Sequence, residues 1–204
     1  MRRFFIAINL PENIKREIKN IISQIELDAN ARWTPPENWH LTLTFLGYQP
    51  DEATTPILDA IKETATTFPA PELKFEKIIL APPGKSPRMI WLAGAKETSH
   101  ALTEIKNKLD VSLIKNGVRF KNDYKTYNAH ITLARFQNFS DYKISNSLIN
   151  QLTNQPISFI ISFTAQSLDL MESHLHPVRN CPARSTATTA LGRSVSNGVK
   201  RAGA

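Results

Sequence analysis

The sequence is poor in cysteine and contains no long apolar run. Cys181 is the only cysteine among 204 residues, so residues 1–177 have no thiol for nucleophilic catalysis, a disulfide or a zinc site. The longest apolar stretches, such as 4–8 and 159–161, are too short to span a bilayer. The first stretch is also too short for a signal peptide, and Pro11 follows it without a small-residue cleavage site. We therefore expect a cytoplasmic protein, and we expect it to be a monomer.

The basic charge of the chain is concentrated at its end. The net charge is +7, and residues 178–204 contribute +5 of it with five basic and no acidic residues, which leaves +2 for residues 1–177. The mildly basic body permits an RNA partner without requiring one. The composition, 41% hydrophobic and 21% charged, is that of a globular protein.

Hydrophobic periodicity predicts alternating strands and helices along the chain. A region containing paired prolines, 33–38, is predicted as a loop, and a turn is expected at 82–85. The order suggests an α+β fold of two pseudo-symmetric lobes rather than a parallel α/β sheet. The expected strands are 4–9, 39–46, 73–80, 88–92, 128–136 and 156–170, and the expected helices are 11–27, 52–67, 98–115 and 143–152.

Two tetrapeptides repeat one pattern 90 residues apart, namely His40-Leu-Thr-Leu and His130-Ile-Thr-Leu. Residues two apart on a strand point to the same face. We therefore expect His40 to project beside Thr42, and His130 beside Thr132, while the intervening aliphatic residues face a core. If the two strands meet, each contributes half of a site.

Two histidines and two hydroxyls suit acid–base chemistry at phosphorus. An imidazole gives or takes a proton near neutral pH. One histidine can take the proton of an attacking water or hydroxyl while the other protonates the departing alkoxide. The hydroxyls can donate hydrogen bonds to phosphate oxygens, where charge builds up in the transition state. Such a reaction needs neither a metal nor a cofactor.

Other readings of the polar and aromatic residues stay open at this point. His and Thr also occur in half-buried sheets without any function. His174 and His176 have a spacing that could bind a metal, but nothing else in the sequence supports such a site. Arg135 lies five residues after His130, so a regular strand would turn it away, and only a bulge or strand end would return it toward a phosphate. Four aromatic residues could stack on a base, although core packing suits most of them better: Trp33, Trp39, Phe45 and Phe136.

The sequence resembles the 2H phosphoesterases, and in particular the RNA 2′,3′-cyclic phosphodiesterase branch, also called 2′-5′ RNA ligase. The resemblance runs from about Arg3 to Pro177 and rests on three ordered segments, Trp33–Gly47, Arg88–Leu92 and His130–Arg135. It implies a bilobal α+β fold with mainly antiparallel sheets, flanking helices and a central cleft.

The resemblance also implies a reaction and a set of roles. The implied reaction is hydrolysis of a terminal 2′,3′-cyclic phosphate on RNA to a 2′-phosphomonoester, without metal or cofactor. His130 would be the proton acceptor and His40 the proton donor, and phosphate would be held by Thr42, Thr132 and Arg135. The alternatives are ATP-independent 2′-5′ RNA ligation, hydrolysis of a smaller nucleotide cyclic phosphate, and a catalytically idle module that binds RNA ends or nucleotides.

The chain departs from the family pattern at two places. Ala129 stands where the family usually has proline before the second histidine. After Pro177 the family continues with a closing apolar strand, whereas residues 178–204 are small, polar and basic. We therefore expect one bilobal domain at 1–177 and a basic, disordered tail at 178–204, with an unpaired sheet edge where the closing strand is missing. A tail that instead binds RNA is the rival hypothesis.

Overall fold

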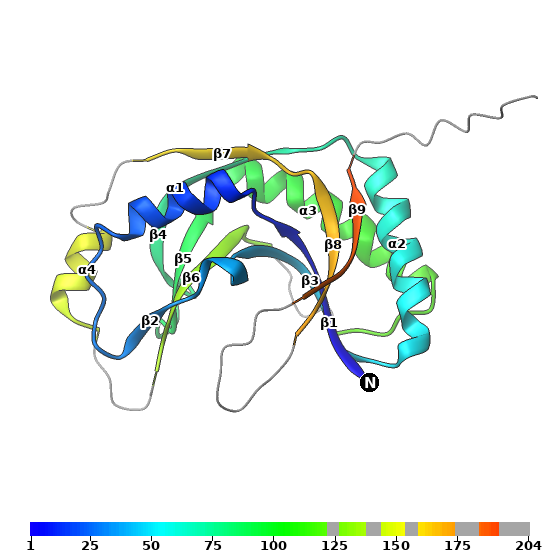
Figure 1. Cartoon of the computed structure of the whole chain (residues 1–204), viewed down its shortest axis with the longest axis horizontal. Coiled ribbons are helices and arrows are strands. Elements are labelled where there is room, and N and C mark those ends of the chain that lie inside the picture. The colour runs from blue at the N-terminus through cyan, green and yellow to red at the C-terminus, as the bar shows by residue number, and fades with distance from the viewer. Residues whose placement is uncertain (122–126, 138–143, 154–158, 174–183, 192–204) are drawn as a thin grey trace, which may run out of the picture.

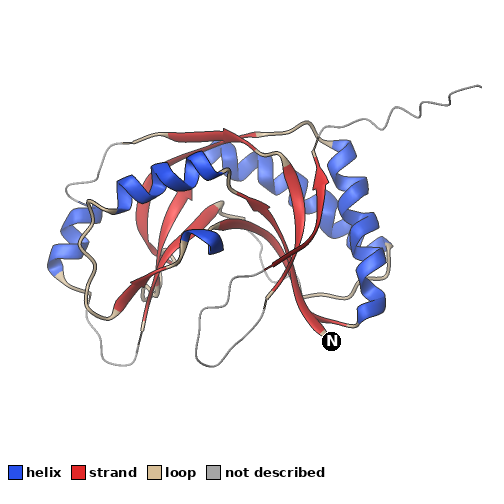
Figure 2. Ribbon diagram, viewed as in Figure 1, coloured by secondary structure: helices blue, strands red, loops and turns tan. Residues whose placement is uncertain are grey.

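The computed structural model describes residues 1–121, 127–137, 144–153, 159–173 and 184–191. Within these residues the chain forms two antiparallel sheets flanked by helices (Figures 1 and 2), so the expected α+β class is confirmed. No helix in this described part is long and apolar enough to cross a membrane.

Each sheet carries one of the two repeated motifs. The first sheet has four strands in the order β3 (His40–Gln49), β1 (Arg2–Asn9), β8 (Ser167–Glu172) and β9 (Arg184–Ala190). The second sheet has five strands in the order β2 (Ala31–Trp33), β6 (His130–Phe136), β5 (Met89–Gly94), β4 (Glu72–Ala81) and β7 (Ile161–Thr164). β3 opens with His40 and β6 opens with His130, and these two strands contact each other where the sheets meet.

Helices cover the apolar faces of both sheets. α1 (Glu12–Ile22) buries four isoleucines along one face, as its periodicity predicts. α2 (Thr54–Thr67) packs on β8 and β9, and the short α4 (Asn146–Thr153) packs on β4. α3 (Lys96–Lys115) contacts β3 in the first sheet as well as β4 and β5 in the second. This helix therefore ties the two motif-bearing sheets together.

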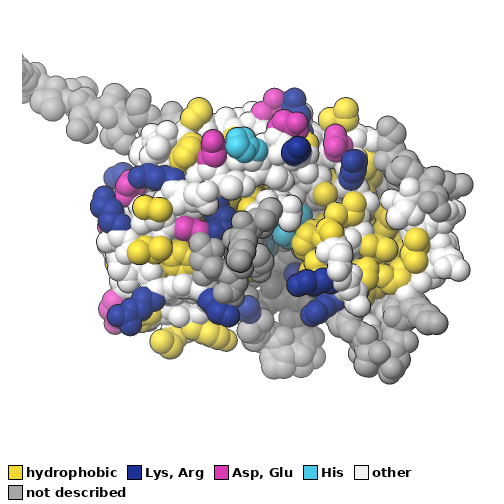
Figure 3. Space-filling model, turned by 180° about the vertical axis from the view of Figure 1, so that it is seen from behind, with side chains coloured by type: hydrophobic (Ala, Val, Ile, Leu, Met, Phe, Trp, Pro, Cys, Tyr) yellow, Lys and Arg dark blue, Asp and Glu magenta, His cyan; other side chains and the backbone are white. Residues whose placement is uncertain are grey.

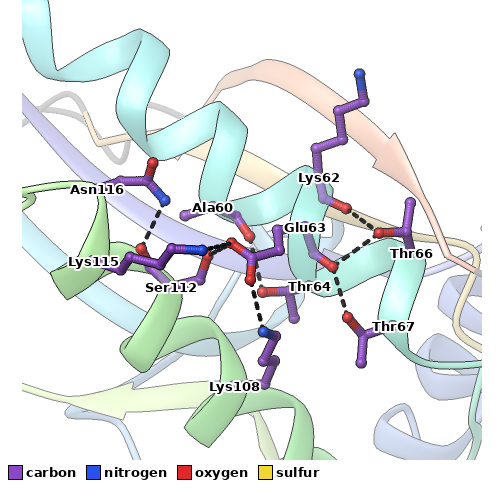
Figure 4. Close-up of polar contacts among 10 residues, drawn as sticks. All are labelled: Ala60, Lys62, Glu63, Thr64, Thr66, Thr67, Lys108, Ser112, Lys115 and Asn116. Atoms are coloured by element: carbon purple, nitrogen blue, oxygen red, sulfur yellow. Dashed lines mark hydrogen bonds and ion pairs between the residues drawn. The ribbon is translucent and has the colours of Figure 1, made fainter.

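A carboxylate on α2 joins the two long helices (Figure 4). Glu63 accepts hydrogen bonds of 2.7 Å from Lys108 Nζ and 2.6 Å from Ser112 Oγ, both on α3. These hydrogen bonds lower the pKa of Glu63 to about 2. The carboxylate therefore remains ionised over the pH range in which the histidines titrate.

The strand orders show the expected pseudo-symmetry. β1 and β3 are antiparallel neighbours connected through α1, and β5 and β6 are antiparallel neighbours connected through α3. On the far side of each pair, β8 follows β1 and β4 follows β5. The two histidines thus begin topologically equivalent strands.

Three expected elements differ from the observed ones. The helix expected over 11–27 ends at Ile22 as α1. The region 156–170 is not one strand: its described part breaks at Ala165 and Gln166 into β7 and β8, which belong to different sheets. The region 33–38 is not wholly a loop, because Trp33 ends the short strand β2 and Pro36–Asn38 form a 3₁₀ turn. β7 alternates buried and exposed residues, whereas β8 has four buried residues in succession. The sheet to which each strand belongs is decided by pairing with distant strands, which a local residue pattern does not show.

The expected loss of the closing strand is wrong. β9 pairs antiparallel with β8 from Ser167↔Ala190 to Glu172↔Arg184, and Leu191 after it is 6% exposed. Backbone hydrogen bonds form this pairing, and threonine suits strands although it gives no apolar alternation. The disorder expected for 178–204 is thus contradicted for 184–191, whereas 178–183 and 192–204 lie outside the described residues.

Removing β9 is expected to destabilise the fold. Truncation after Pro177 leaves β8 paired with β1 alone and removes the buried Leu191. We therefore expect a midpoint of thermal unfolding several degrees lower, from a loss of about 2 kcal/mol. Truncation after Leu191 keeps β9 and serves as the control. Equal unfolding midpoints for the two truncated chains would contradict the structural role of β9.

Candidate active site

The two motif strands repeat one pattern of burial. Along both strands the histidine and threonine are half-buried, while the intervening residues Leu41, Leu43, Ile131 and Leu133 are at most 3% exposed. The alternation expected from the tetrapeptides is therefore present. A histidine side chain is visible in the hollow at the middle of one face of the molecule, with Lys and Arg side chains to either side (Figure 3).

Both strands bulge directly after the threonine. Ala7 pairs with Thr42 and Ile6 with Thr44, so Leu43 has no partner on β1. In the same way Trp91 pairs with Thr132 and Ile90 with Ala134, which leaves Leu133 without a partner on β5. Each bulge shifts the phase of its strand by one residue.

This shift decides where Arg135 points. Leu133 and Ala134 are buried in succession, and Arg135 returns to the exposed phase that His130 and Thr132 follow. A regular strand would turn Arg135 away from His130. Because of the bulge, Arg135 lies on the same face of β6 as His130 and Thr132. Phe45 occupies the equivalent position on β3 and is 51% exposed.

His130 is held on two sides. Its Nδ1 lies 2.8 Å from the carbonyl oxygen of Asn128. A carbonyl only accepts, so this contact assigns the proton to Nδ1 and leaves the lone pair of Nε2 free. The indole of Trp91 stacks on the imidazole with ring centroids 3.7 Å apart and planes 17° apart. The ring is thus fixed in orientation and in tautomer.

His40 has a closely similar setting. The backbone of Asn38 forms a hydrogen bond with the imidazole of His40. The ring centroids of Phe5 and His40 are 4.9 Å apart. Asn38 and Asn128 each stand two residues before their histidine, so the repeat extends to Asn-x-His-x-Thr. The longer repeat is a sequence signal for the residues that orient the two imidazoles.

Electrostatic effects show that the half-sites converge. Burial is the main cause that lowers the pKa of His40 from 6.5 to about 4, and the charges of Arg135 and His130 act in the same direction. The pKa of His130 is also lowered, by burial and then by Arg135. Arg135 therefore acts on both imidazoles. An anion bound among these groups would offset the repulsion and raise the pKa of both histidines.

Tyr127 connects the two motifs directly. Its hydroxyl donates a 2.9 Å hydrogen bond to the carbonyl oxygen of Thr42, although it lies only three residues before His130. Burial raises the pKa of this phenol far above its usual value, so the hydroxyl keeps its proton as a donor. The entrance to β6 is thereby fixed to the middle of the first motif.

Ala129, where the resemblance predicts proline, has its own partners. The amide of Ala129 donates to Ser99 Oγ at 3.1 Å, a bond that proline could not make. Its carbonyl accepts a 2.8 Å hydrogen bond from the amide of Gly94. A Cβ at Gly94 would lie 2.9 Å from the Cβ of Ala129, so glycine is required for this approach. The segment before His130 is therefore held without proline.

Tyr127→Phe is expected to lower both turnover and stability. Loss of one neutral hydrogen bond costs about 1 kcal/mol, and we expect a fall of about fivefold in kcat because the two motifs are no longer held in register. The matched control is Tyr48→Phe on β3, since Tyr48 is 62% exposed. Equal kcat values for the two variants would show that the hydroxyl does not position the site.

A buried ion pair supports the first motif strand from α3. Thr44, next to the bulge, donates a 2.8 Å hydrogen bond to Asp110 Oδ1. Asp110 also pairs with Lys106, and the side chains of both are 6% exposed. Because this network links α3 to β3, it fixes the bulged part of the strand relative to the second sheet.

The aromatic residues and the remaining metal-ligand candidates lie in different places. Trp39 and Phe136 are buried and belong to the core, and Trp33 packs partly buried against it, so only Phe45 offers a large exposed ring. Within the described ranges no group of three His, Cys, Asp or Glu side chains could hold a metal ion. His174, His176 and Cys181 lie outside the described residues.

One pocket formed by the described residues lies away from the motifs. Its lining is mainly apolar and includes Ile25, Ile78, Leu152 and Phe159 from the region around β4 and α4. It contains neither histidine nor arginine. We therefore place the candidate active site at the two motifs, where the acid–base groups converge.

Known proteins share both the sequence pattern and the fold. Residues 8–91 match the family model described as LigT like Phosphoesterase. An RNA 2′,3′-cyclic phosphodiesterase of Archaeoglobus fulgidus is 32% identical over 133 residues, which cover 65% of this chain and 72% of that protein. A protein of the same name from Methanothermobacter thermautotrophicus is 24% identical over 176 residues, covering 86% and 91%.

Solved structures show the same architecture. A protein of Thermus thermophilus superposes with a TM-score of 0.75 at 21% identity, covering 93% of this chain and 98% of its own. E. coli LigT complexed with 3′-AMP superposes with a TM-score of 0.63 at 22% identity, covering 94% and 99%. These similarities and the duplicated histidine motif establish that the chain belongs to the LigT-like phosphoesterases of the 2H family.

Proposed function

We propose that this chain hydrolyses 2′,3′-cyclic phosphate ends of RNA to 2′-phosphomonoesters. The observation that carries the proposal is the convergence of His40, His130 and Arg135, in which the arginine charge lowers the pKa of both imidazoles. Two proton-transfer groups and a cation around one position suit a phosphodiester that gains negative charge during the reaction. The names of the relatives at modest identity support a cyclic phosphate as the substrate.

In the proposed reaction, His130 is the general base. Its Nε2 lone pair, free because Nδ1 faces the carbonyl of Asn128, takes a proton from water as the water oxygen bonds to phosphorus. The stacked indole of Trp91 faces the imidazolium that forms, and the negative face of an aromatic ring stabilises a cation. Both contacts stabilise the protonated imidazole.

His40 is the proposed general acid. As the bond between phosphorus and the 3′ oxygen breaks, His40 donates a proton to that oxygen, which leaves as the 3′ hydroxyl. The lowered pKa means that His40 is mostly neutral in the free chain near pH 7. The bound phosphate anion raises the pKa, so substrate binding favours uptake of the proton that is later donated. Exchange with solvent then resets both imidazoles.

The remaining motif residues bind the phosphate. Thr42 and Thr132 lie on the same exposed phase of their strands as the histidines, and their hydroxyls can donate to the non-bridging oxygens. Arg135 supplies a positive charge beside them. Phe45 is the ring we assign to stacking on the terminal base, because it is half exposed at the position equivalent to Arg135.

Product analysis with an RNA oligonucleotide tests the proposal. The substrate carries a 2′,3′-cyclic phosphate and is incubated with the chain in excess EDTA, and the ends are identified by phosphorus NMR. We expect a 2′-phosphomonoester at the same rate with and without EDTA. A 3′-phosphomonoester, or dependence on a divalent metal, would contradict the proposal. Binding without turnover would favour the idle RNA-end module.

A further inference from the structure

A second arginine lies directly opposite Arg135. In the antiparallel pairing of β2 with β6, Arg32 is the partner of Arg135, between the pairs Ala31↔Phe136 and Trp33↔Ala134. Directly opposite residues project from the same face with Cβ atoms about 5 Å apart. Both arginines are exposed, whereas Ala31, Ala134 and Phe136 are buried. The two guanidinium groups therefore emerge together.

This pair carries charge that no described residue balances. Like charges directly opposite on a sheet are destabilising. Neither arginine forms an ion pair with a carboxylate in the described part of the chain, and the polar contact found for Arg135 is with Met89 Sδ at 3.2 Å. Arg2 behaves differently, since it lies 2.9 Å from Asp51 and 3.7 Å from Glu172. An anionic ligand would relieve the repulsion between the opposed arginines.

The position of the pair indicates which anion it takes. The charge of Arg135 reaches both histidines, so this residue borders the position of the cyclic phosphate. Arg32 lies one strand further out, on β2, which is the edge strand of the second sheet (Figure 1). An RNA strand carries one charged phosphate per nucleotide, so in an oligonucleotide a second phosphate lies on the 5′ side of the terminal nucleoside, next to the reacting one.

We propose that Arg32 binds the phosphodiester that joins the last two nucleotides of the substrate. The inference rests on the proposed function and adds to it a preference for oligonucleotides over mononucleotides. Arg135 lies between the reacting phosphate and this second subsite. The guanidinium fork of Arg32 matches two phosphate oxygens, and its exposed position on an edge strand leaves room for the chain of the RNA.

Substrates that differ only in one charge test the second subsite. kcat/KM is measured for a dinucleotide that ends in a 2′,3′-cyclic phosphate, with either a normal phosphodiester or a neutral methylphosphonate between the nucleotides. We expect the wild-type chain to prefer the charged linkage by about tenfold. Arg32→Gln is expected to abolish this preference, and Arg32→Lys to restore part of it. Arg16→Gln on α1, where Arg16 is exposed, is the matched control.

The outcomes separate this inference from the proposed function. If Arg32→Gln lowers kcat/KM equally for both linkages, or leaves the preference intact, the second subsite is wrong. If the wild-type chain cleaves neither dinucleotide, the proposed function fails. In that case Kd is measured for two dinucleotides that end in a 2′-phosphate, one with a phosphodiester linkage and one with a methylphosphonate linkage. Their comparison tests Arg32 independently of turnover. A tenfold difference that disappears in Arg32→Gln supports the subsite, and equal Kd values overturn it.

Discussion

His130→Asn is expected to lower kcat for cyclic phosphate hydrolysis by about 10³-fold, within the range of about 10² to 10⁴ that a general base contributes. Asparagine approximates the size of the imidazole and can keep a hydrogen bond to the carbonyl of Asn128, which histidine makes at 2.8 Å. It cannot accept a proton from water. The measurement is single-turnover hydrolysis of an RNA oligonucleotide with saturating enzyme, which removes product release from the rate.

The control for this variant is a histidine outside the site. His100 lies on α3 with a side chain that is 79% exposed and 3.8 Å from Glu104. His100→Asn should therefore match the wild-type rate. Thermal unfolding of both variants shows whether the fold is kept. A folded His130→Asn chain with more than about a tenth of the wild-type rate would contradict the role of His130 as base.

His40→Asn is expected to cause a loss of similar size, about 10³-fold, because an alkoxide leaves poorly without a proton. This loss depends on the leaving group. In a substrate with sulfur at the 3′ bridging position, the departing group is a thiolate, whose conjugate acid has a pKa of about 8.5. We therefore expect the sulfur substrate to restore most of the activity of His40→Asn.

The same sulfur substrate distinguishes the two histidines. It should not rescue His130→Asn, because activation of the attacking water is unaffected by the leaving atom. Rescue of His130→Asn but not of His40→Asn would reverse the assigned roles. Rescue of neither variant would show that His40 acts on some step other than departure of the 3′ oxygen.

The features that were predicted correctly from the sequence are those set by a short local pattern. The His-x-Thr spacing placed both pairs on the half-buried faces of strands, because side-chain direction alternates on any regular strand. The helix over 98–115 was predicted nearly to its ends, since α3 runs from Lys96 to Lys115. These features depend on local order along one strand or helix.

Features that depend on a neighbouring strand were not predicted. The bulges at Leu43 and Leu133 arise from pairing with β1 and β5, and they decide the direction of Arg135. β2 is three residues long and exists through its pairing with β6. β9 has no apolar alternation that would predict a strand, and its threonine-rich sequence forms an edge strand by pairing with β8.

The contact between Tyr127 and Thr42 illustrates the same limit at the level of one hydrogen bond. The two residues are 85 apart in sequence, and nothing in either segment indicates that they meet. The longer repeat Asn-x-His-x-Thr, by contrast, was available in the sequence. It would have identified the carbonyls of Asn38 and Asn128 as partners of the imidazoles.

The pH dependence of kcat/KM tests most directly the claim that two imidazoles act together across one phosphate. This quantity reports the free chain, in which the pKa of His40 is lowered to about 4 and that of His130 lies below 6.5. The base must be deprotonated and the acid protonated, so we predict a bell with its maximum on the acidic side of pH 6.5. His130→Asn should lose the acidic limb and His40→Asn the basic limb. A profile that stays bell-shaped when both histidines are replaced would contradict the account.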